Sequence, residues 1–538
     1  MNEKLIKNVN KIMTDEEAAQ NTTPQTAAAP PEAAGGTGQE APPKSTTPAL
    51  TMTLALFALM AVFFYHIYRI GVLPLPYMLA LGGGLLILLL IVALLSWNRE
   101  KKGRCAVGIG LTVLLSGILL FGIFYTSKFL DMIKRVTAPF VKETVVMELY
   151  VRDDDPARSL SDMADYRFSI LNVADRDLSD KALAQIENRL KKQITPEEYG
   201  APTQLVNALL SGEAQSILIS SSLKETALEA LGLPHNEPRL RLIESFRVEY
   251  EGQKPSQAEE PAPRTEDLPA EMPEGWRFSS RSGIFAIYIS GIDDRDGLSS
   301  RSLSDVNIIA VVNTNTHQVL LINTPRDFFV KTPVSGDARD KLTHAGLYGV
   351  DVSRQTLENL YGMDIDYVFK LDFKGFIRII DALGGIDVES DADFTAEDIH
   401  FVKGMNHLTG YQALLFARIR KGLEGGDRAR GRHQMAIIQA VAQKAASPEI
   451  LKNYDAVLAA LSGSFETTVP YDKASAVVRE QLAQGGLWHT KTYSVTGSDS
   501  FDNSFTFPDR NYVMVPDMAT IEEARRLMWD LFRGVELP

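Results

Sequence analysis

Three long apolar stretches dominate the pattern of hydrophobic and polar positions in the first quarter of the chain. They run from about Ala49 to Ile70, Pro76 to Trp97 and Cys105 to Leu130. Each has close to the roughly 20 apolar residues that a helix needs to cross the hydrocarbon core of a bilayer. The pattern therefore predicts three transmembrane helices within residues 49–130. A buried helical hairpin in a soluble core is disfavoured, because three uncharged stretches of this length rarely occur together in soluble folds.

The loop between the second and third stretches predicts the orientation of the protein. Residues 98–104 read NREKKGR and carry four basic side chains, and such loops stay on the cytoplasmic side. Three spans then place the residues after about Lys134 on the other side. We expect a multi-pass protein of the cytoplasmic membrane with a cytoplasmic N-terminus and an extracytoplasmic C-terminal part.

Two segments have the composition of chains without a packed core. Residues 1–48 mix Ala, Pro, Thr, Gln and Gly without an apolar period, which is typical of a disordered tail, here cytoplasmic. Residues 252–275 are rich in Pro, Glu and Ala, as expected of an extended linker. The segment between the spans and this linker, residues 140–251, alternates strand-like runs with helical periodicity, for example over Lys181–Ile194. It predicts a small α/β accessory domain.

From residue 276 to residue 538, short runs of branched apolar residues alternate with helical patterns. The predicted buried strands are Ile284–Ser290, Val306–Val312 and Val319–Ile322. The predicted helices are Ser353–Tyr361, Phe373–Leu383, Thr409–Arg418, Gln434–Ala446 and Ile521–Phe532. This alternation predicts a sheet with helices on both faces.

Composition narrows the range of functions and of stabilising bonds. The formal charge of −13 argues against a nucleic-acid partner, because that affinity comes mainly from clustered Lys and Arg. The single cysteine, Cys105, excludes an internal disulfide, so an extracytoplasmic domain must be stabilised by its core.

Two aspartates occur where predicted strands end and begin. Asp293 follows the first buried strand, and Asp305 lies twelve positions later, before the second. Together they suit a divalent cation such as Mg²⁺, which commonly uses one or two carboxylates plus substrate phosphates. Aspartates at strand ends also cap turns, and the sequence leaves both interpretations open.

Arginines concentrate at three positions of the same region. Arg326 follows a predicted strand and is next to Asp327. Arg418 and Arg420 lie at the end of a predicted helix. Arg428 and Arg430 lie just before the next predicted helix. Planar guanidinium groups bind phosphate oxygens in pairs, so a phosphate-bearing ligand suits the cluster. Solvated faces or ion pairs with nearby acids are the alternative.

The ordered motifs of residues 284–447 resemble the LytR-CpsA-Psr (LCP) family of cell-envelope proteins. They are G-x-D-x-R at Gly291–Arg295, S-D at Ser304–Asp305, P-R-D at Pro325–Asp327, K-L-T-H-A at Lys341–Ala345, R-x-R at Arg418–Arg420 and D-x-x-R at Asp427–Arg430. Four positions depart from the family pattern: Leu303 and His433 each replace an arginine, Val306 replaces a threonine, and Thr343 replaces an asparagine.

The resemblance implies an α/β/α sandwich as the LCP catalytic domain, preceded by the three transmembrane helices and the accessory domain. It implies transfer of a phosphoglycan, such as teichoic acid or capsule, from a polyprenyl pyrophosphate-linked precursor to a peptidoglycan hydroxyl. The transfer would take place at the outer face of the cytoplasmic membrane. By motif, Asp293 and Asp305 would hold Mg²⁺. The pyrophosphate ligands would be Arg326, Arg418, Arg420, Arg428 and Arg430, and Asp305 and Asp327 are the candidate proton acceptors.

Two other functions use the same residues. A polyprenyl pyrophosphate hydrolase would replace the peptidoglycan hydroxyl by water. A non-catalytic envelope-related regulator would bind polyprenyl phosphates without needing the metal carboxylates. The acidic balance and the predicted outward topology disfavour direct DNA binding in either case.

Overall fold

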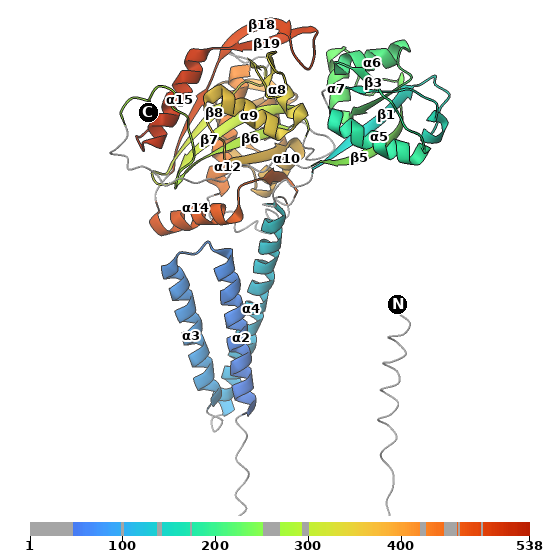
Figure 1. The fold of residues 1–538 in the computed structure, drawn as a ribbon. Coiled ribbons are helices and arrows are strands. Elements are labelled where there is room, and N and C mark those ends of the chain that lie inside the picture. The colour runs from blue at the N-terminus through green and yellow to red at the C-terminus, as the bar shows by residue number, and fades with distance from the viewer. Residues whose placement is uncertain are drawn as a thin grey trace, which may run out of the picture. The chain divides into compact units, whose positions relative to one another are not determined.

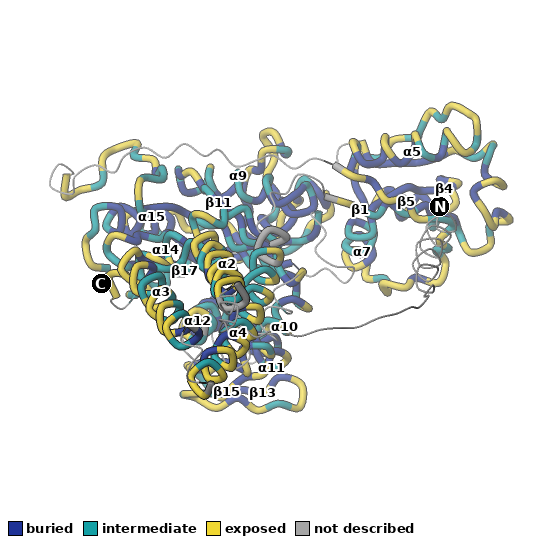
Figure 2. Tube along the Cα trace, turned by 90° about the horizontal axis from the view of Figure 1, so that it is seen from below, coloured by how far each residue is buried: buried dark blue, intermediate teal, exposed yellow. Residues whose placement is uncertain are grey.

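The computed structural model describes residues 47–97, 102–136, 143–172, 175–250, 269–292, 301–419, 427–445, 460, 463–485 and 488–537. The predicted tail, apart from residues 47–48, and most of the predicted linker lie outside these residues. The first three helices are α2 (Thr47–Ile70), α3 (Leu75–Trp97) and α4 (Lys102–Val136) (Figure 1). Each contains a stretch of 21 to 29 residues that is long and apolar enough to cross a membrane. Large parts of α2 and α3 expose their side chains (Figure 2), which confirms the three predicted spans as candidate membrane helices.

A five-stranded mixed sheet follows, in the order β3-β2-β4-β1-β5. Its strands are β1 (Glu143–Arg152), β2 (Phe168–Leu171), β3 (Glu197–Tyr199), β4 (Ser216–Ser220) and β5 (Leu240–Tyr250), and its helices are α5 (Arg176–Leu190), α6 (Pro202–Ser211) and α7 (Ser221–Ala230). One buried cluster packs α5 against the sheet, and another packs α6 and α7. The predicted α/β character is confirmed, although the domain boundaries stay a prediction. The helix predicted over Lys181–Ile194 begins earlier and ends at Leu190, because Lys191 takes a left-handed conformation with φ 55°.

The second sheet has six strands in the order β16-β11-β6-β7-β8-β17. They are β6 (Ile284–Ile292), β7 (Ser304–Asn313), β8 (Gln318–Asn323), β11 (Tyr367–Asp372), β16 (Phe465–Thr467) and β17 (His489–Ser494). The pairs β11–β6 and β8–β17 are parallel, and the other neighbours are antiparallel. The three strands predicted here are confirmed as β6, β7 and β8.

Helices cover both faces of this sheet, so the predicted α/β/α sandwich is confirmed. They are α9 (Val350–Tyr361), α10 (Phe373–Ala382), α11 (Gly410–Arg418), α12 (Asp427–Ala445), α14 (Tyr471–Gln484) and α15 (Met518–Phe532). Alternate residues of β7 define the two layers. Ile309 and Val311 belong to the core that contains α9 and α15, whereas Ile308 packs with Met435 of α12. Helix α12 begins seven residues before the predicted Gln434. The sequence pattern missed these residues because the arginine-rich first turns carry no apolar period.

Shorter elements connect the layers. They comprise α8 (Leu342–Ala345) and the antiparallel pairs β9 (Phe329–Val330) with β10 (Asp340–Lys341), β12 (Ile386–Ser390) with β15 (Gly404–Leu408), β13 (Phe394–Ala396) with β14 (Ile399–Phe401), and β18 (Gly497–Asn503) with β19 (Arg510–Pro516).

Candidate functional site

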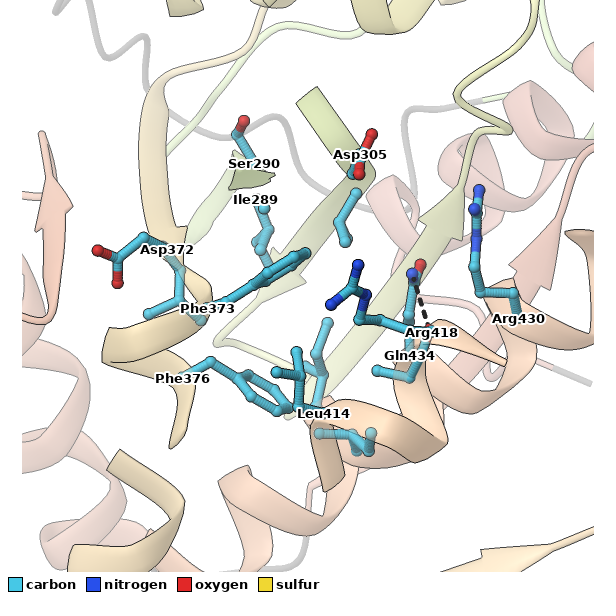
Figure 3. Close-up of a pocket in the computed structure, with 16 residues that line it drawn as sticks. Ile289, Ser290, Asp305, Asp372, Phe373, Phe376, Leu414, Arg418, Arg430 and Gln434 are labelled. Atoms are coloured by element: carbon cyan, nitrogen blue, oxygen red, sulfur yellow. Dashed lines mark hydrogen bonds between the residues drawn. The ribbon is translucent and has the colours of Figure 1, made fainter. Parts of the chain in front are cut away.

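A cavity of about 320 Å³ opens where β6 and β11 end and β7 begins (Figure 3). Polar and charged side chains form part of its wall, and apolar side chains from the three strands and from α10, α11 and α12 form the rest. The lining residues are Ile289, Ser290, Gly291, Asp305, Val306, Leu371, Asp372, Phe373, Phe376, Leu414, Ala417, Arg418, Arg430, Gln434, Ile437 and Ile438. The cavity therefore combines cations, carboxylates and a large apolar surface.

Asp305 reaches the cavity because it is the extra residue of a β-bulge. Gly291 pairs with Val306 and Ile292 pairs with Ser304, which leaves Asp305 without a cross-strand partner. A bulge redirects the side chain of the inserted residue, and bulges often occur beside active sites. Gly291 makes the adjacent pairing possible, since a Cβ atom there would lie 2.7 Å from the Val306 side chain.

A buried hydrogen-bond network between β6 and β7 stabilises this bulge. The Tyr288 hydroxyl donates to Asn307 at 2.7 Å and lies 2.8 Å from the Ser304 hydroxyl, which is 2.9 Å from that of Ser290. Burial raises the pKa of Tyr288, so its hydroxyl stays protonated. Gly346 packs against the same backbone: a Cβ atom there would lie 2.2 Å from the Ser302 carbonyl oxygen. The start of β7 is thus held firmly.

Asp305 belongs to a cluster of alternating charges. Arg326 forms an ion pair with Asp305, and the Thr343 hydroxyl lies 3.5 Å from the same carboxylate oxygen. The Asp327 carboxylate lies 3.7 Å from Arg326 Nε and 3.4 Å from Lys341 Nζ. Backbone hydrogen bonds, including Thr343 N to the Arg326 carbonyl at 2.8 Å, hold the P-R-D and K-L-T-H-A segments together. The cluster connects the cavity wall to the loops around it.

Two of the predicted arginines line the cavity itself. Arg418 ends α11, and its guanidinium lies 4.8 Å from the centre of the Phe373 ring. Arg430 lies in the first turn of α12 and is 5% exposed. Figure 3 shows Arg418 extending into the cavity between Phe373 and Gln434, with Asp305 and Arg430 at its edge. Guanidinium groups in such a partly dehydrated site bind phosphate oxygens strongly.

The wall offers one carboxylate for a cation among the described residues. Asp372 also lines the cavity, but it caps α10 by accepting a hydrogen bond from Gly375 N at 2.5 Å. No group of three or more His, Cys, Asp or Glu side chains suited to a metal occurs in the described part of the chain. Asp305 beside a phosphate-sized space still fits Mg²⁺, because that ion takes one or two carboxylates and completes its shell with phosphates and water.

A second cavity of about 430 Å³ continues the apolar part of the first. It shares five wall residues with the first, namely Ile289, Leu371, Phe376, Ile437 and Ile438, and adds Ile287, Phe369, Ile379, Ile380, Ala382, Leu383, Val441, Ala442 and Phe465. These residues come from β6, β11, β16, α10 and α12. The two cavities form one amphiphilic space, charged at one end and apolar at the other.

The predicted site residues occupy three kinds of position. Asp305, Arg418 and Arg430 line the cavity. Arg326 contacts Asp305 at its wall, and Asp327 lies behind it, largely buried. Asp293 and Arg420 lie outside the described residues, as does the side chain of Arg428.

The apolar half of the space escaped sequence reasoning. Phe376 and Leu414 have the apolar helical pattern of ordinary core residues, yet both line the cavity. Leu357 has the same pattern but belongs to the core on the opposite face of the sheet. An apolar residue on a helix gives no sequence signal that separates a core from a groove. Lys341, which was not among the predicted site residues, could have been predicted to lie near the site, because it is the first residue of the K-L-T-H-A motif.

His433, which replaces a family arginine, belongs to the core rather than to the phosphate site. Its ring stacks on Phe416 at a centroid distance of 4.1 Å and on Phe394 at 5.3 Å. Its Nδ1 lies 3.1 Å from the Phe416 carbonyl oxygen. Burial lowers the pKa of His433, so the ring is neutral near pH 7 and supplies no cationic charge.

Comparisons with known proteins agree with the motifs. A sequence model of the LytR_cpsA_psr family matches residues 248–519, just over half of the chain. A curated Bacillus cereus protein, polyisoprenyl-teichoic acid–peptidoglycan teichoic acid transferase TagU, is 36% identical over 195 residues, covering 36% of this chain and 63% of that relative. Oceanobacillus iheyensis TagU is 33% identical over 199 residues, covering 36% of this chain and 61% of the relative. The chain thus spans less than two thirds of these relatives. The crystal structure of B. subtilis TagV is 28% identical, with a TM-score of 0.39, covering 47% of this chain and 98% of that one.

Proposed function

Because the chain belongs to the LytR-CpsA-Psr family, we propose that it transfers a phosphoglycan from a polyprenyl pyrophosphate-linked precursor to a peptidoglycan hydroxyl. The observation that carries this proposal is the amphiphilic space, in which Arg418 and Arg430 line one end and only apolar side chains line the other. A polyprenyl pyrophosphate has the same division, with charge at one end and hydrocarbon along the rest. The TagU relatives are teichoic acid transferases, which supports a wall polymer as the glycan.

The arginines and the apolar wall would bind the two halves of the donor. Arg418 and Arg430 contact the pyrophosphate oxygens, and paired guanidinium contacts neutralise the charge that develops on them during transfer. Arg326, held beside the cavity by its ion pair with Asp305, adds a third cation. Phe376, Ile438 and their neighbours pack against the prenyl chain, whose burial adds about 25 cal/mol for each Å² removed from water.

The reaction is a displacement at phosphorus. The acceptor hydroxyl oxygen forms a bond to the phosphorus that carries the glycan, the bond from that phosphorus to the bridging oxygen breaks, and polyprenyl phosphate leaves with the electron pair. Phosphoryl transfer is catalysed mainly by positioning and charge neutralisation. The hydroxyl proton passes to the Asp305 carboxylate. Asp327 is less suited to this step, because its buried carboxylate does not line the cavity.

A magnesium ion belongs to this proposal. Asp305, together with Asp293, would hold it, and the ion would supply further neutralisation of the phosphate charge. In the structure the Asp305 carboxylate pairs with Arg326, so a cation held by Asp305 would lie next to this guanidinium.

The proposal includes the location of the reaction. The basic loop between α3 and α4 stays cytoplasmic, and three spans place the LCP domain outside, where the peptidoglycan acceptor is found. The protein is then a multi-pass protein of the cytoplasmic membrane that works at its outer face.

A transfer assay separates this function from its alternatives. The full chain in lipid nanodiscs would receive a polyprenyl pyrophosphate-linked disaccharide, Mg²⁺ and purified peptidoglycan, and mass spectrometry would identify the products. The proposal expects glycan phosphate attached to peptidoglycan and an equal amount of polyprenyl phosphate. Free glycan phosphate formed at the same rate without peptidoglycan would indicate a hydrolase, and binding without turnover would indicate a regulator.

A further inference from the structure

Two aromatic side chains form a pair on the β18–β19 hairpin. Phe501 of β18 and Tyr512 of β19 are directly opposite each other in the antiparallel register. Their ring centroids are 5.9 Å apart with an interplanar angle of 77°. Phe501 is 60% exposed. We call Phe501 and Tyr512 the aromatic platform.

The platform adjoins the charged cluster of the site. Lys341 Nζ lies 5.9 Å from the centre of the Tyr512 ring and 3.4 Å from Asp327. Asp327 in turn neighbours Arg326, the ion-pair partner of Asp305. The platform therefore lies beyond the Asp327 side of the cluster, and neither of its residues lines the arginine cavity.

The hairpin that carries the platform is fixed at two places. Along β19, Met514 N donates to the Asp327 carbonyl oxygen at 2.8 Å. At the turn, Thr506 donates to the Asp340 carboxylate through its backbone N at 3.0 Å and through its hydroxyl at 2.5 Å. The other oxygen of Asp340 lies 2.6 Å from His344 Nδ1. A hairpin tied to the P-R-D and K-L-T-H-A segments holds its rings ready for a ligand.

The chemistry of the platform suits a sugar ring. An exposed aromatic face packs against the apolar C–H face of a sugar, and nearby carboxylates accept hydrogen bonds from its hydroxyl or amide groups. Asp499, which accepts a hydrogen bond from the Tyr512 hydroxyl at 2.9 Å, supplies such a carboxylate on the same face of the hairpin and is exposed. Its negative charge disfavours the phosphate-bearing donor.

We propose that the aromatic platform binds a sugar ring of the peptidoglycan acceptor strand and so presents the acceptor hydroxyl to the site. This inference rests on the proposed function. The donor occupies the arginine cavity, and the platform beside Lys341 receives the second substrate.

Binding measurements on the full chain in nanodiscs test the platform. The probe is a soluble, uncrosslinked peptidoglycan glycan fragment, titrated onto the unaltered protein and onto Phe501→Ala, Phe501→Trp and Val515→Ala. Val515 is 40% exposed on the opposite face of the hairpin and provides the matched control. Phe501→Ala should weaken fragment binding roughly five- to ten-fold, since one aromatic contact is lost, whereas Phe501→Trp and Val515→Ala should bind as before. In turnover, Phe501→Ala should raise KM for peptidoglycan and leave kcat and KM for the donor nearly unchanged.

A second titration with polyprenyl phosphate separates failure of the platform from failure of the proposed function. If the unaltered protein binds polyprenyl phosphate but Phe501→Ala binds the glycan fragment normally, the platform assignment is wrong while the function stands. Weakened binding of a lipid-linked disaccharide, with fragment binding intact, would assign the platform to the donor and overturn the proposal. If polyprenyl phosphate itself does not bind, the proposed function fails first.

Discussion

Asp305 faces the cavity because one extra residue interrupts the pairing of β6 with β7. Its carboxylate meets Arg326 on one side and the space beside Arg418 and Arg430 on the other. In the proposed function, this one side chain brings together a cation, a guanidinium and a phosphate.

Replacing Asp305 by Asn should abolish Mg²⁺-dependent transfer while leaving the fold intact. The amide keeps the shape of the side chain but loses the charge that attracts a cation and pairs with Arg326. Transfer by nanodisc-embedded protein would be measured over a Mg²⁺ titration. Asp337→Asn, on a fully exposed carboxylate paired with Lys331, is the matched control. Near-normal Mg²⁺-dependent turnover of folded Asp305→Asn would refute the metal assignment.

Replacing Arg418 by Lys should weaken binding of a polyprenyl pyrophosphate analogue. Lysine keeps the charge but loses the paired donors that match phosphate oxygens, and a lost charge-assisted contact costs about 1.5 to 3 kcal/mol, or roughly ten- to a hundred-fold in affinity. Arg526→Lys, in a surface ion pair of α15, should bind as the unaltered protein does. Equal affinities of the two variants would show that Arg418 does not contact the phosphates.

At this scale, sequence alone identified the charged residues but not their surroundings. Asp305, Arg418 and Arg430 stood out because charge is rare in an α/β core and because the motifs contain them. Phe373 and Ile438 did not, since an apolar helix residue has the same pattern whether it fills a core or lines a groove.

Among the elements, α11 and α12 position both cavity arginines, and His433 holds the two helices together. Its ring lies between Phe416 and Phe394, with Nδ1 beside the Phe416 carbonyl. The first turn of α12 is rich in arginine and has no apolar period. The helix start predicted from the sequence is therefore later than the observed one. The buried strands were predicted well, because continuous branched apolar runs have few alternatives.

The contact made by His433 should make the stability of this region depend on pH. Burial lowers the pKa of His433 in the folded state, whereas the unfolded ring titrates near pH 6.5. Below that pH the unfolded chain binds the extra proton, so the free energy of unfolding falls as the pH drops from about 7.5 to 5.5. Asp391, which lies 3.5 Å from Nε2 and also pairs with Arg432, opposes part of this effect.

Hydrogen exchange over residues 410–418 would measure the pH dependence locally. Exchange rates corrected for intrinsic chemistry should show lower protection at pH 5.5 than at pH 7.5, and His433→Phe should reduce the difference. His489→Gln, on an exposed ring, is compared as the control. A pH dependence that is the same in His433→Phe and the unaltered protein would mean that another group causes it.

For the whole molecule, the three apolar stretches were sufficient to predict the candidate membrane helices, because uncharged apolar stretches of this length are rare in soluble folds. The accessory domain and the order of the six-stranded sheet were not predictable in detail. Strand order depends on contacts between residues far apart in sequence, such as those that place β11 beside β6 and β17 beside β8. With three membrane spans, the basic loop and the LCP domain should lie on opposite sides of the membrane.

Cysteine labelling tests that topology with few changes, because Cys105 is the single native cysteine. In a Cys105→Ser background, Ser498→Cys should react with a membrane-impermeant maleimide in right-side-out vesicles. Gly103→Cys, beside the basic loop, should react only after the membrane is permeabilised. Both residues are exposed. The reverse pattern would place the LCP domain in the cytoplasm and exclude peptidoglycan as its acceptor.

An experimental structure of the full chain with bound polyprenyl pyrophosphate would show whether the amphiphilic space holds the donor. The pyrophosphate should lie between Arg418, Arg430 and Asp305, with the prenyl chain along Phe376 and Ile438 toward Phe465. A pyrophosphate bound away from both arginines, or a prenyl chain outside the apolar cavity at saturating ligand, would contradict it.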